Sequence, residues 1–112
     1  MELSKPDKRI ARAIIEKGLM KEFDKGLNKA DKILNDWKQG KGEARESYLA
    51  LYKQITSFDK RIAKRYDGMS NYDLIFIVIQ QVDENLVDKQ ELEAFSEEGK
   101  LIIQRILSLR DM

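Results

Sequence analysis

The residues that could carry chemistry in this 112-residue chain are mostly carboxylates, because the sequence contains no histidine and no cysteine. The missing histidine removes the commonest general base, the usual catalytic zinc ligand and the Ser-His-Asp arrangement. The missing cysteine removes disulfide bonds, thiolate metal sites and a cysteine nucleophile. Any chemistry would therefore depend on acidic side chains, and binding on charged or apolar surfaces.

The acidic residues do not form a convincing catalytic pattern. Glu43 and Glu46 could supply one carboxylate pair of a magnesium-dependent phosphate-ester hydrolase, but a matching pair is missing from the rest of the sequence. A calcium loop placed over the acidic segment near Val82 would put that valine at a ligand position. Asp59 and Glu16 fall near the apolar edges of predicted helices, where salt bridges explain them. We therefore predict a protein that is not an enzyme and needs no metal or cofactor.

A lysine-rich face is the clearest charged feature of the first predicted helix. Its five lysines recur every three or four residues and so share one side of a helix: Lys17, Lys21, Lys25, Lys29 and Lys32. Such a face could bind the phosphate backbone of a nucleic acid. However, acidic residues are interspersed, and no aromatic side chain accompanies the lysines to stack on a base. We interpret it as a solvated helix surface, with accessory nucleic-acid binding as the alternative.

The charge of the chain is unevenly distributed, although its net value is only +1. Residues 1–68 contain 17 lysines and arginines against 11 acidic residues, whereas residues 69–112 contain 4 against 9. The two parts are expected to pair with each other, or the basic part with an acidic partner. The sequence has no apolar leader and no apolar run near the ~20 residues that span a bilayer. This favours a cytoplasmic protein that does not enter a membrane.

Only one proline and six glycines interrupt the chain, which favours long helices. Ser4–Asp7, Ser70–Asp73 and Asp88–Glu91 have the spacing of capping boxes and mark three helix starts. We predict an all-α fold with residues 1–112 as one domain, an antiparallel four-helix bundle with short connections. The predicted helices span about residues 5–39, 43–66, 71–87 and 89–110.

The longest apolar run, Leu74–Ile79, is expected to form the buried centre of this bundle. A helix that is apolar on nearly all sides belongs in a protein interior. Its β-branched residues also allow a strand, but no second strand-like run exists to pair with it. Part of this helix is expected to face a second subunit, because three neighbours do not need so much apolar surface.

The first predicted helix contains two apolar registers that are out of phase. Ile10, Ile14 and Ile15 lie on nearly the opposite side from Phe23 and Leu34, which belong to a stripe that begins at Met20, and Gly18 lies between the two sets. Either the helix breaks or bends near Gly18, or the three isoleucines form an exposed patch, which often marks an interaction site. Our leading hypothesis is an interaction module that binds another protein or itself as a homodimer, with these isoleucines as the partner-binding candidates.

Overall fold

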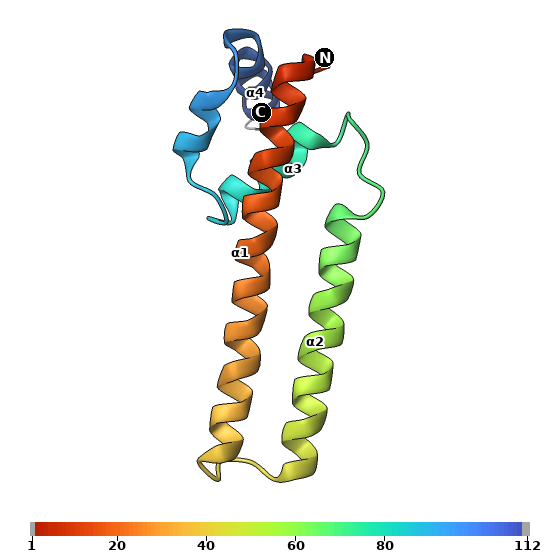
Figure 1. Cartoon of the computed structure of the whole chain (residues 1–112), viewed down its shortest axis with the longest axis vertical. Coiled ribbons are helices and arrows are strands. Elements are labelled where there is room, and N and C mark those ends of the chain that lie inside the picture. Colours follow the sequence, from red (N-terminus) through yellow and green to blue (C-terminus); the bar gives the residue numbers. More distant parts are fainter. Residues whose placement is uncertain (1, 111–112) are drawn as a thin grey trace. The chain divides into compact units, whose positions relative to one another are not determined.

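All regular structure between residues 2 and 110 is helical (Figure 1), which confirms the predicted all-α fold. The computed structural model describes these residues; Met1 and residues 111–112, the ends of the predicted domain, lie outside them. Four α-helices and one 3-10 helix follow one another along the chain. They are α1 (Lys5–Lys38), α2 (Ala44–Tyr66), α3 (Leu74–Asp83), η1 (Lys89–Ala94) and α4 (Glu97–Arg110).

The chain forms two compact units, and α1 contributes to both of them. Unit 1 consists of the residues up to Lys21 together with those from Met69 onward. The hairpin, which is the second unit, spans Glu22–Gly68 and so contains the later part of α1 and all of α2. In unit 1 α1 packs against α3, and in the hairpin it packs against α2. The prediction of one domain is not tested by this division and stays a prediction.

The hairpin has nearly the boundaries that its glycines predict. Figure 1 shows the later part of α1 beside α2, joined by a short turn. Gly40 has a φ of 77° after the end of α1, and Gly68 has a φ of 69° after the end of α2. Both values lie in the left-handed region that glycine adopts without a steric penalty. Each helix therefore stops where the chain must change direction.

The core of unit 1 is built around α3, as the apolar run predicts. Leu74, Ile75, Ile77, Val78 and Ile79 are all buried. The other buried apolar residues of unit 1 come from the first turns of α1 and from the C-terminal segment, among them Ala11, Phe95 and Ile103. Phe76 is the exception in the run, with half of its surface exposed. Burial of a helix on almost every side is what its uniformly apolar sequence favours.

Two of the predicted helices are too long. The third helix begins at Leu74 rather than residue 71 and ends at Asp83 rather than residue 87. Its end is followed by Asn85, whose positive φ of 59° is incompatible with a continuing helix. The predicted fourth helix is divided into η1 and α4, because Phe95 has an extended backbone with ψ of 154°. That break places the Phe95 side chain in the core and leaves Ser96 to begin α4.

The expected break near Gly18 is wrong, since α1 is one uninterrupted helix of 34 residues, while the alternative of a bend there stays a prediction. A Cβ atom built on Gly18 would lie 2.2 Å from Nε2 of Gln81, so the glycine provides space for that buried amide. Gly99 has a similar role, because its Cβ would lie 2.6 Å from Oδ2 of Asp7. Both glycines therefore permit close packing, and the two registers of α1 face different neighbours.

Candidate interaction surface

The hairpin is held together by a narrow set of inward contacts. Gly26 lies under the ring of Phe58, which would be 2.9 Å from a Cβ at that position. The side-chain amide of Gln54 donates to the backbone oxygen of Gly26 at 3.1 Å. The helices approach each other closely here because glycine has no side chain. These contacts define which faces of α1 and α2 point toward each other.

A buried ion pair joins the open end of the hairpin. Glu22 is 6% exposed and accepts a hydrogen bond from Nη1 of Arg65 at 2.9 Å. The hydroxyl group of Tyr66 donates to the same carboxylate oxygen, Oε1. Removing one member would leave a buried charge without compensation, which costs more than the loss of an exposed pair. The pair therefore orients the end of α2 against α1.

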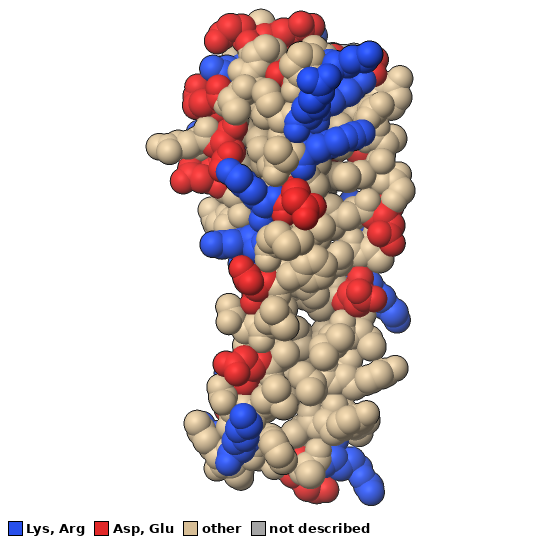
Figure 2. All heavy atoms as spheres, viewed as in Figure 1, with Lys and Arg blue, Asp and Glu red and all other residues tan. Residues whose placement is uncertain are grey.

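Beside these contacts, the hairpin has an apolar surface that nothing in the hairpin covers. Among the 23 residues of α2, none is buried. Figure 2 shows a largely uncharged surface over the hairpin in this view. We call this surface the hairpin face and define it by seven large apolar residues, each at least 39% exposed: Phe23, Leu27, Leu34, Trp37, Tyr48, Tyr52 and Ile55.

The geometry of two antiparallel helices places these residues on one side. On α1, the side chains of Phe23 and Leu27 are rotated about the helix axis by roughly 90° on average from the inward-facing Gly26. On α2, Tyr52 and Tyr48 are offset from the inward-facing Phe58 by a similar angle in the same rotational sense. Because the helices run in opposite directions, the same rotation brings both sets to one face of the hairpin.

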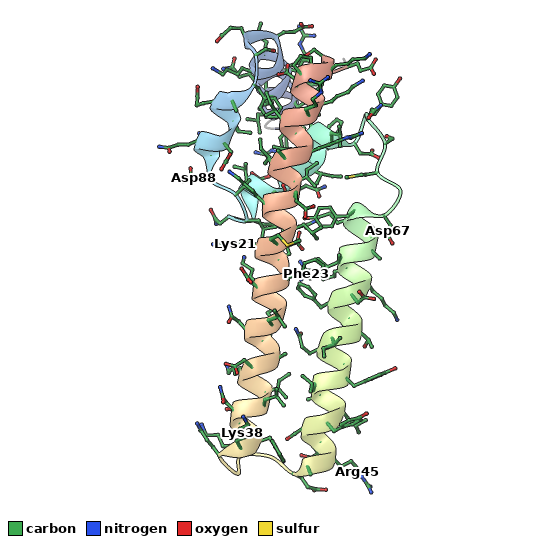
Figure 3. All side chains as sticks on the ribbon, in the orientation of Figure 1. Lys21, Phe23, Lys38, Arg45, Asp67 and Asp88 are labelled. Carbon is green, nitrogen blue, oxygen red and sulfur yellow. The ribbon has the colours of Figure 1, made fainter. Side chains whose placement is uncertain are left out.

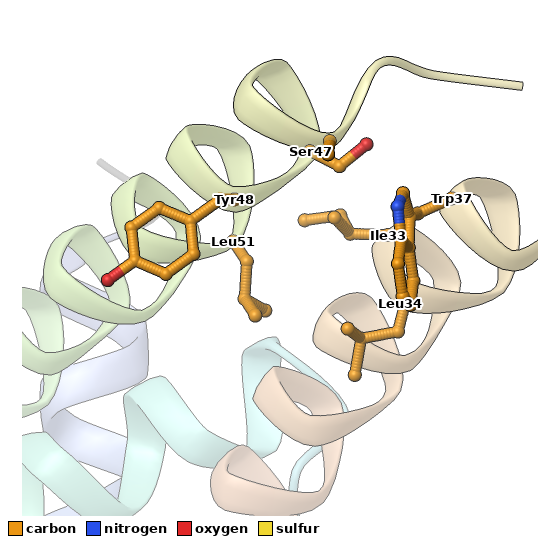
Figure 4. Close-up of a pocket in the computed structure, with 7 residues that line it drawn as sticks. Ile33, Leu34, Trp37, Ser47, Tyr48 and Leu51 are labelled. Carbon is orange, nitrogen blue, oxygen red and sulfur yellow. The ribbon is translucent and has the colours of Figure 1, made fainter.

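A groove is formed in the hairpin face near the turn. Its volume is about 300 Å³, and Figure 4 shows side chains from both helices around it. Leu34 and Trp37 line it from α1, while Tyr48 and Leu51 line it from α2. The indole of Trp37 and the ring of Tyr48 border the groove without meeting across it. An apolar groove bordered by aromatic rings is typical of surfaces that receive an apolar side chain from a partner.

The isoleucines predicted to bind a partner lie elsewhere. Ile14 and Ile15 are each 3% exposed in the core of unit 1, and Ile10 is partly buried. The expectation that they form an exposed patch is therefore wrong for Ile14 and Ile15, because that register of α1 packs within unit 1. Their assignment to partner binding stays a prediction, without an exposed surface to support it.

The five lysines of the predicted basic face are all exposed. In unit 1, Nζ of Lys17 forms an ion pair with Glu91 at 2.9 Å, and Lys21 lies one turn later. In the hairpin, Lys25, Lys29 and Lys32 have no ion pair within the described residues. They lie on the side of α1 away from the hairpin face, since lysines at these positions are offset from Phe23 by well over 100°.

The strongest polar site in unit 1 is structural. Asp7 is 1% exposed and accepts hydrogen bonds from the backbone N–H of Ser96 at 2.9 Å and from its hydroxyl group at 2.5 Å. Burial raises the pKa of Asp7, but the two bonds from Ser96 and a third with Ser4 outweigh it and hold the pKa below its ordinary value. The carboxylate therefore remains charged while it joins the start of α1 to the start of α4.

Glu43 and Glu46, the proposed half of a magnesium site, are exposed at the start of α2. Within residues 2–110, no three carboxylates gather closely enough to hold a metal ion. Over the same range, each helix is too short or too polar to cross a lipid bilayer.

The sequence analysis did not identify the hairpin face, because it placed both helices of the hairpin in one four-helix bundle, where their apolar sides would be covered. A hint was present in the composition of α2, where Tyr48 and Tyr52 join Leu51 and Ile55 to give an apolar surface wider than one neighbouring helix can cover.

The chain matches no protein-family model, no curated protein and no solved structure.

Proposed function

We propose that this protein is a non-enzymatic interaction module and that its hairpin face binds another protein chain. One observation carries the proposal: α2 has no buried residue, although it is an amphipathic helix rich in tyrosine and aliphatic side chains. Leaving such a surface in water is unfavourable, at roughly 25 cal/mol for each Å² of apolar area. A partner that covers the face would recover this free energy.

The sequence predicts an antiparallel four-helix bundle within residues 1–112, and that stays a prediction; we propose in addition that a bundle of the same type is completed between two chains. Two helices of the hairpin leave one side open, and two further helices laid against it would complete a bundle of this type. Tyrosine and tryptophan favour such a role, because they supply large contact areas with little loss of conformational entropy. The partner chain is thus expected to present an apolar helical surface.

The test is a comparison of two substitutions on α2 that differ in position and not in exposure. Ile55 lies on the hairpin face and is 53% exposed, whereas Leu49 is 57% exposed and points away from α1. Proteins that co-purify with the wild-type chain, this chain itself included, are identified and then mixed again in purified form. Binding of at least one is expected to be lost in Ile55→Glu and kept in Leu49→Glu. If no binding partner distinguishes the two variants, the proposal is wrong.

A second candidate function is nucleic-acid binding by Lys25, Lys29 and Lys32. The observation that favours it is that all three lysines are exposed and that none of them forms an ion pair with another residue between positions 2 and 110. A gel-shift titration at two salt concentrations tests it, since binding to phosphates weakens steeply as salt rises. Absence of any shift at low salt would eliminate this candidate.

A further inference from the structure

We propose that the occupant of the hairpin face is a second copy of this chain, packed face to face and antiparallel to the first. This inference rests on the proposed function, because it names the partner of the same surface. Three features support it: the size of the face, the charges along its edges, and the order of apolar residues along each helix. Each is a property of the hairpin alone.

The exposed area is close to what a stable dimer needs. The seven residues of the hairpin face are between 39% and 69% exposed. With about 200 Å² for each large side chain when fully exposed, they present roughly 700 Å² to solvent. A specific protein interface of standard size buries about 800 Å² on each partner. Adding the edges of the face brings the hairpin into this range without any contribution from unit 1.

Four charged residues flank the two ends of the face, two on each helix. They are Asp24 and Lys38 on α1, and Arg45 and Asp59 on α2. All four are exposed, and within the described residues none of them forms an ion pair. Lys38 and Arg45 are both near the turn, as Figure 3 shows. Each helix thus has one acidic and one basic residue at opposite ends of the face, and α1 has a further exposed acid, Asp31, midway between its two.

Contacts between α1 and α2 define the level of each charged residue, by which we mean its position along the long axis of the hairpin. Gly26 is level with Gln54 and Phe58, so Asp24 lies near the level of Asp59. Near the turn, Lys38 likewise lies close to the level of Arg45, since the groove there is lined by Trp37 and Ala44. Like charges are therefore level with each other within one hairpin.

Two symmetric arrangements can bring two hairpin faces together. In a parallel dimer, α1 lies against the α2 of the second copy at the same level, so Asp24 opposes Asp59 and Lys38 opposes Arg45. In an antiparallel dimer, α1 lies against α1 and α2 against α2 in reverse order. Asp24 then opposes Lys38 of the second copy, and Arg45 opposes Asp59. Asp31, midway along the same edge of α1, then opposes its own copy across the two-fold axis, which is one like-charge contact against four opposite-charge contacts. Charge complementarity therefore still favours the antiparallel dimer, because the parallel dimer has like charges at all four of the end positions.

The apolar residues of the hairpin face also match one another in the antiparallel arrangement. A two-fold interface requires that if one residue contacts a second, the second contacts the first in the other copy. Reversing α1 about its centre brings Leu27 opposite Leu34 and Phe23 opposite Trp37. The same reversal of α2 brings Tyr48 opposite Ile55 and leaves Tyr52 near the two-fold axis. Large side chains thus meet large side chains along the whole face, and the groove beside Trp37 is positioned to receive the Phe23 end of the second copy.

The first measurement is the mass of the full-length protein in solution at increasing concentration, by sedimentation velocity. A dimer is expected for the wild-type chain and for Leu49→Glu. Ile55→Glu is expected to weaken dimerisation about a hundredfold or more, because two carboxylates would be buried in the interface. A wild-type chain that stays monomeric at every concentration overturns the inference. In that case the proposed function survives if another purified partner still distinguishes Ile55→Glu from Leu49→Glu, and it fails with the inference if none does.

The second measurement determines the orientation by exchanging charges. Asp24→Lys is expected to weaken an antiparallel dimer about tenfold, since two opposite-charge pairs become like-charge pairs. The double variant Asp24→Lys/Lys38→Asp is expected to restore the wild-type dissociation constant. If Asp24→Lys instead strengthens dimerisation, the new lysine pairs with Asp59 of the second copy, and the dimer is parallel. No change in either variant would also contradict the antiparallel arrangement.

A cross-link gives an independent measure of orientation. The chain has no cysteine, so Tyr52→Cys introduces a single thiol group. A short bis-maleimide is expected to link two copies through this position, because Tyr52 lies near the two-fold axis of the antiparallel dimer. Leu49→Cys, on the outer side of α2, is the control and is expected to remain uncross-linked. A result in which the control is linked and Tyr52→Cys is not would contradict the proposed face.

Discussion

Gly18 shows how a single residue can have a role opposite to the one its type predicts. In a helix, glycine is less favourable than alanine by about 1 kcal/mol, and it is often found at breaks. Here the helix continues, and the absent side chain lets the amide of Gln81 donate to the backbone oxygen of Ile15 at 3.0 Å. Gln81 is completely buried, so its hydrogen bond matters more than the intrinsic preference of Gly18.

We expect Gly18→Ala to destabilise the protein by about 1–3 kcal/mol, since its methyl group would overlap Gln81. Gln81→Ala alone is expected to cost about 1 kcal/mol or more through the lost hydrogen bond and packing. In the double variant the new methyl group has space, and the two costs are not additive. Urea denaturation of the four proteins measures this coupling. Additive free energies of unfolding would mean that the two residues do not compete for the same space.

Asp7 gives the stability of the protein a defined dependence on pH. Its pKa is lower in the folded state than the usual value of about 3.9, because its hydrogen bonds with Ser96 and Ser4 outweigh the effect of burial. The folded state thus favours the charged carboxylate. Its contribution to stability is complete above the unfolded pKa and is lost as the pH falls through the lower folded pKa.

Asp7→Asn is therefore expected to lower stability by about 1–3 kcal/mol at neutral pH, since an amide cannot accept both bonds in the same way. The loss relative to wild type should shrink as the pH falls below 4. Free energies of unfolding measured from pH 7 to pH 3 check this. Asp67→Asn, at an exposed aspartate, is the control for the chemical change itself. A difference between Asp7→Asn and wild type that is constant over this range would contradict the assignment.

At the scale of elements, capping explains where the C-terminal segment departs from its predicted helix. Asp88 accepts a hydrogen bond from the backbone N–H of Gln90 at 2.9 Å, which begins η1 as its capping pattern indicates. The helix then ends early, because Ser96 provides a second cap. Its hydroxyl oxygen accepts from the backbone N–H of Gly99 at 3.1 Å and its hydroxyl group donates to Asp7. A long-range bond of this kind has no local signature in the sequence.

Ser96→Ala is expected to destabilise the protein by about 1–2 kcal/mol, the usual cost of removing a serine cap. Hydrogen exchange should show the first turn of α4 opening more often, while α2 is unaffected. Ser108→Ala, near the other end of α4 and exposed, should change neither measurement. Equal effects of the two substitutions would contradict the capping role.

At the scale of the whole molecule, the sequence predicts the helical fold and the hairpin well, but it does not predict which neighbour each apolar face of α1 meets. The periodicity of α1 identifies two apolar registers, but periodicity reports which residues share a face and not which neighbour the face meets. From periodicity alone, Ile14 is assigned to an exposed patch and Phe23 to a stripe in the core. In the structure Ile14 is buried in unit 1, and Phe23 is 41% exposed on the hairpin. The candidate surface was missed for that reason.

Unit 1 is made of two segments that the hairpin separates in the sequence, and this affects the order in which the chain folds. The hairpin is made of neighbouring residues, whereas the bond between Asp7 and Ser96 joins positions 89 residues apart. Local contacts form faster than distant ones, because less chain entropy is lost in closing the intervening loop. During synthesis, α1 and α2 emerge before α4 exists, so the face we assign to the second copy is expected to form before the core of unit 1 can close. Self-association during translation would then precede completion of the fold.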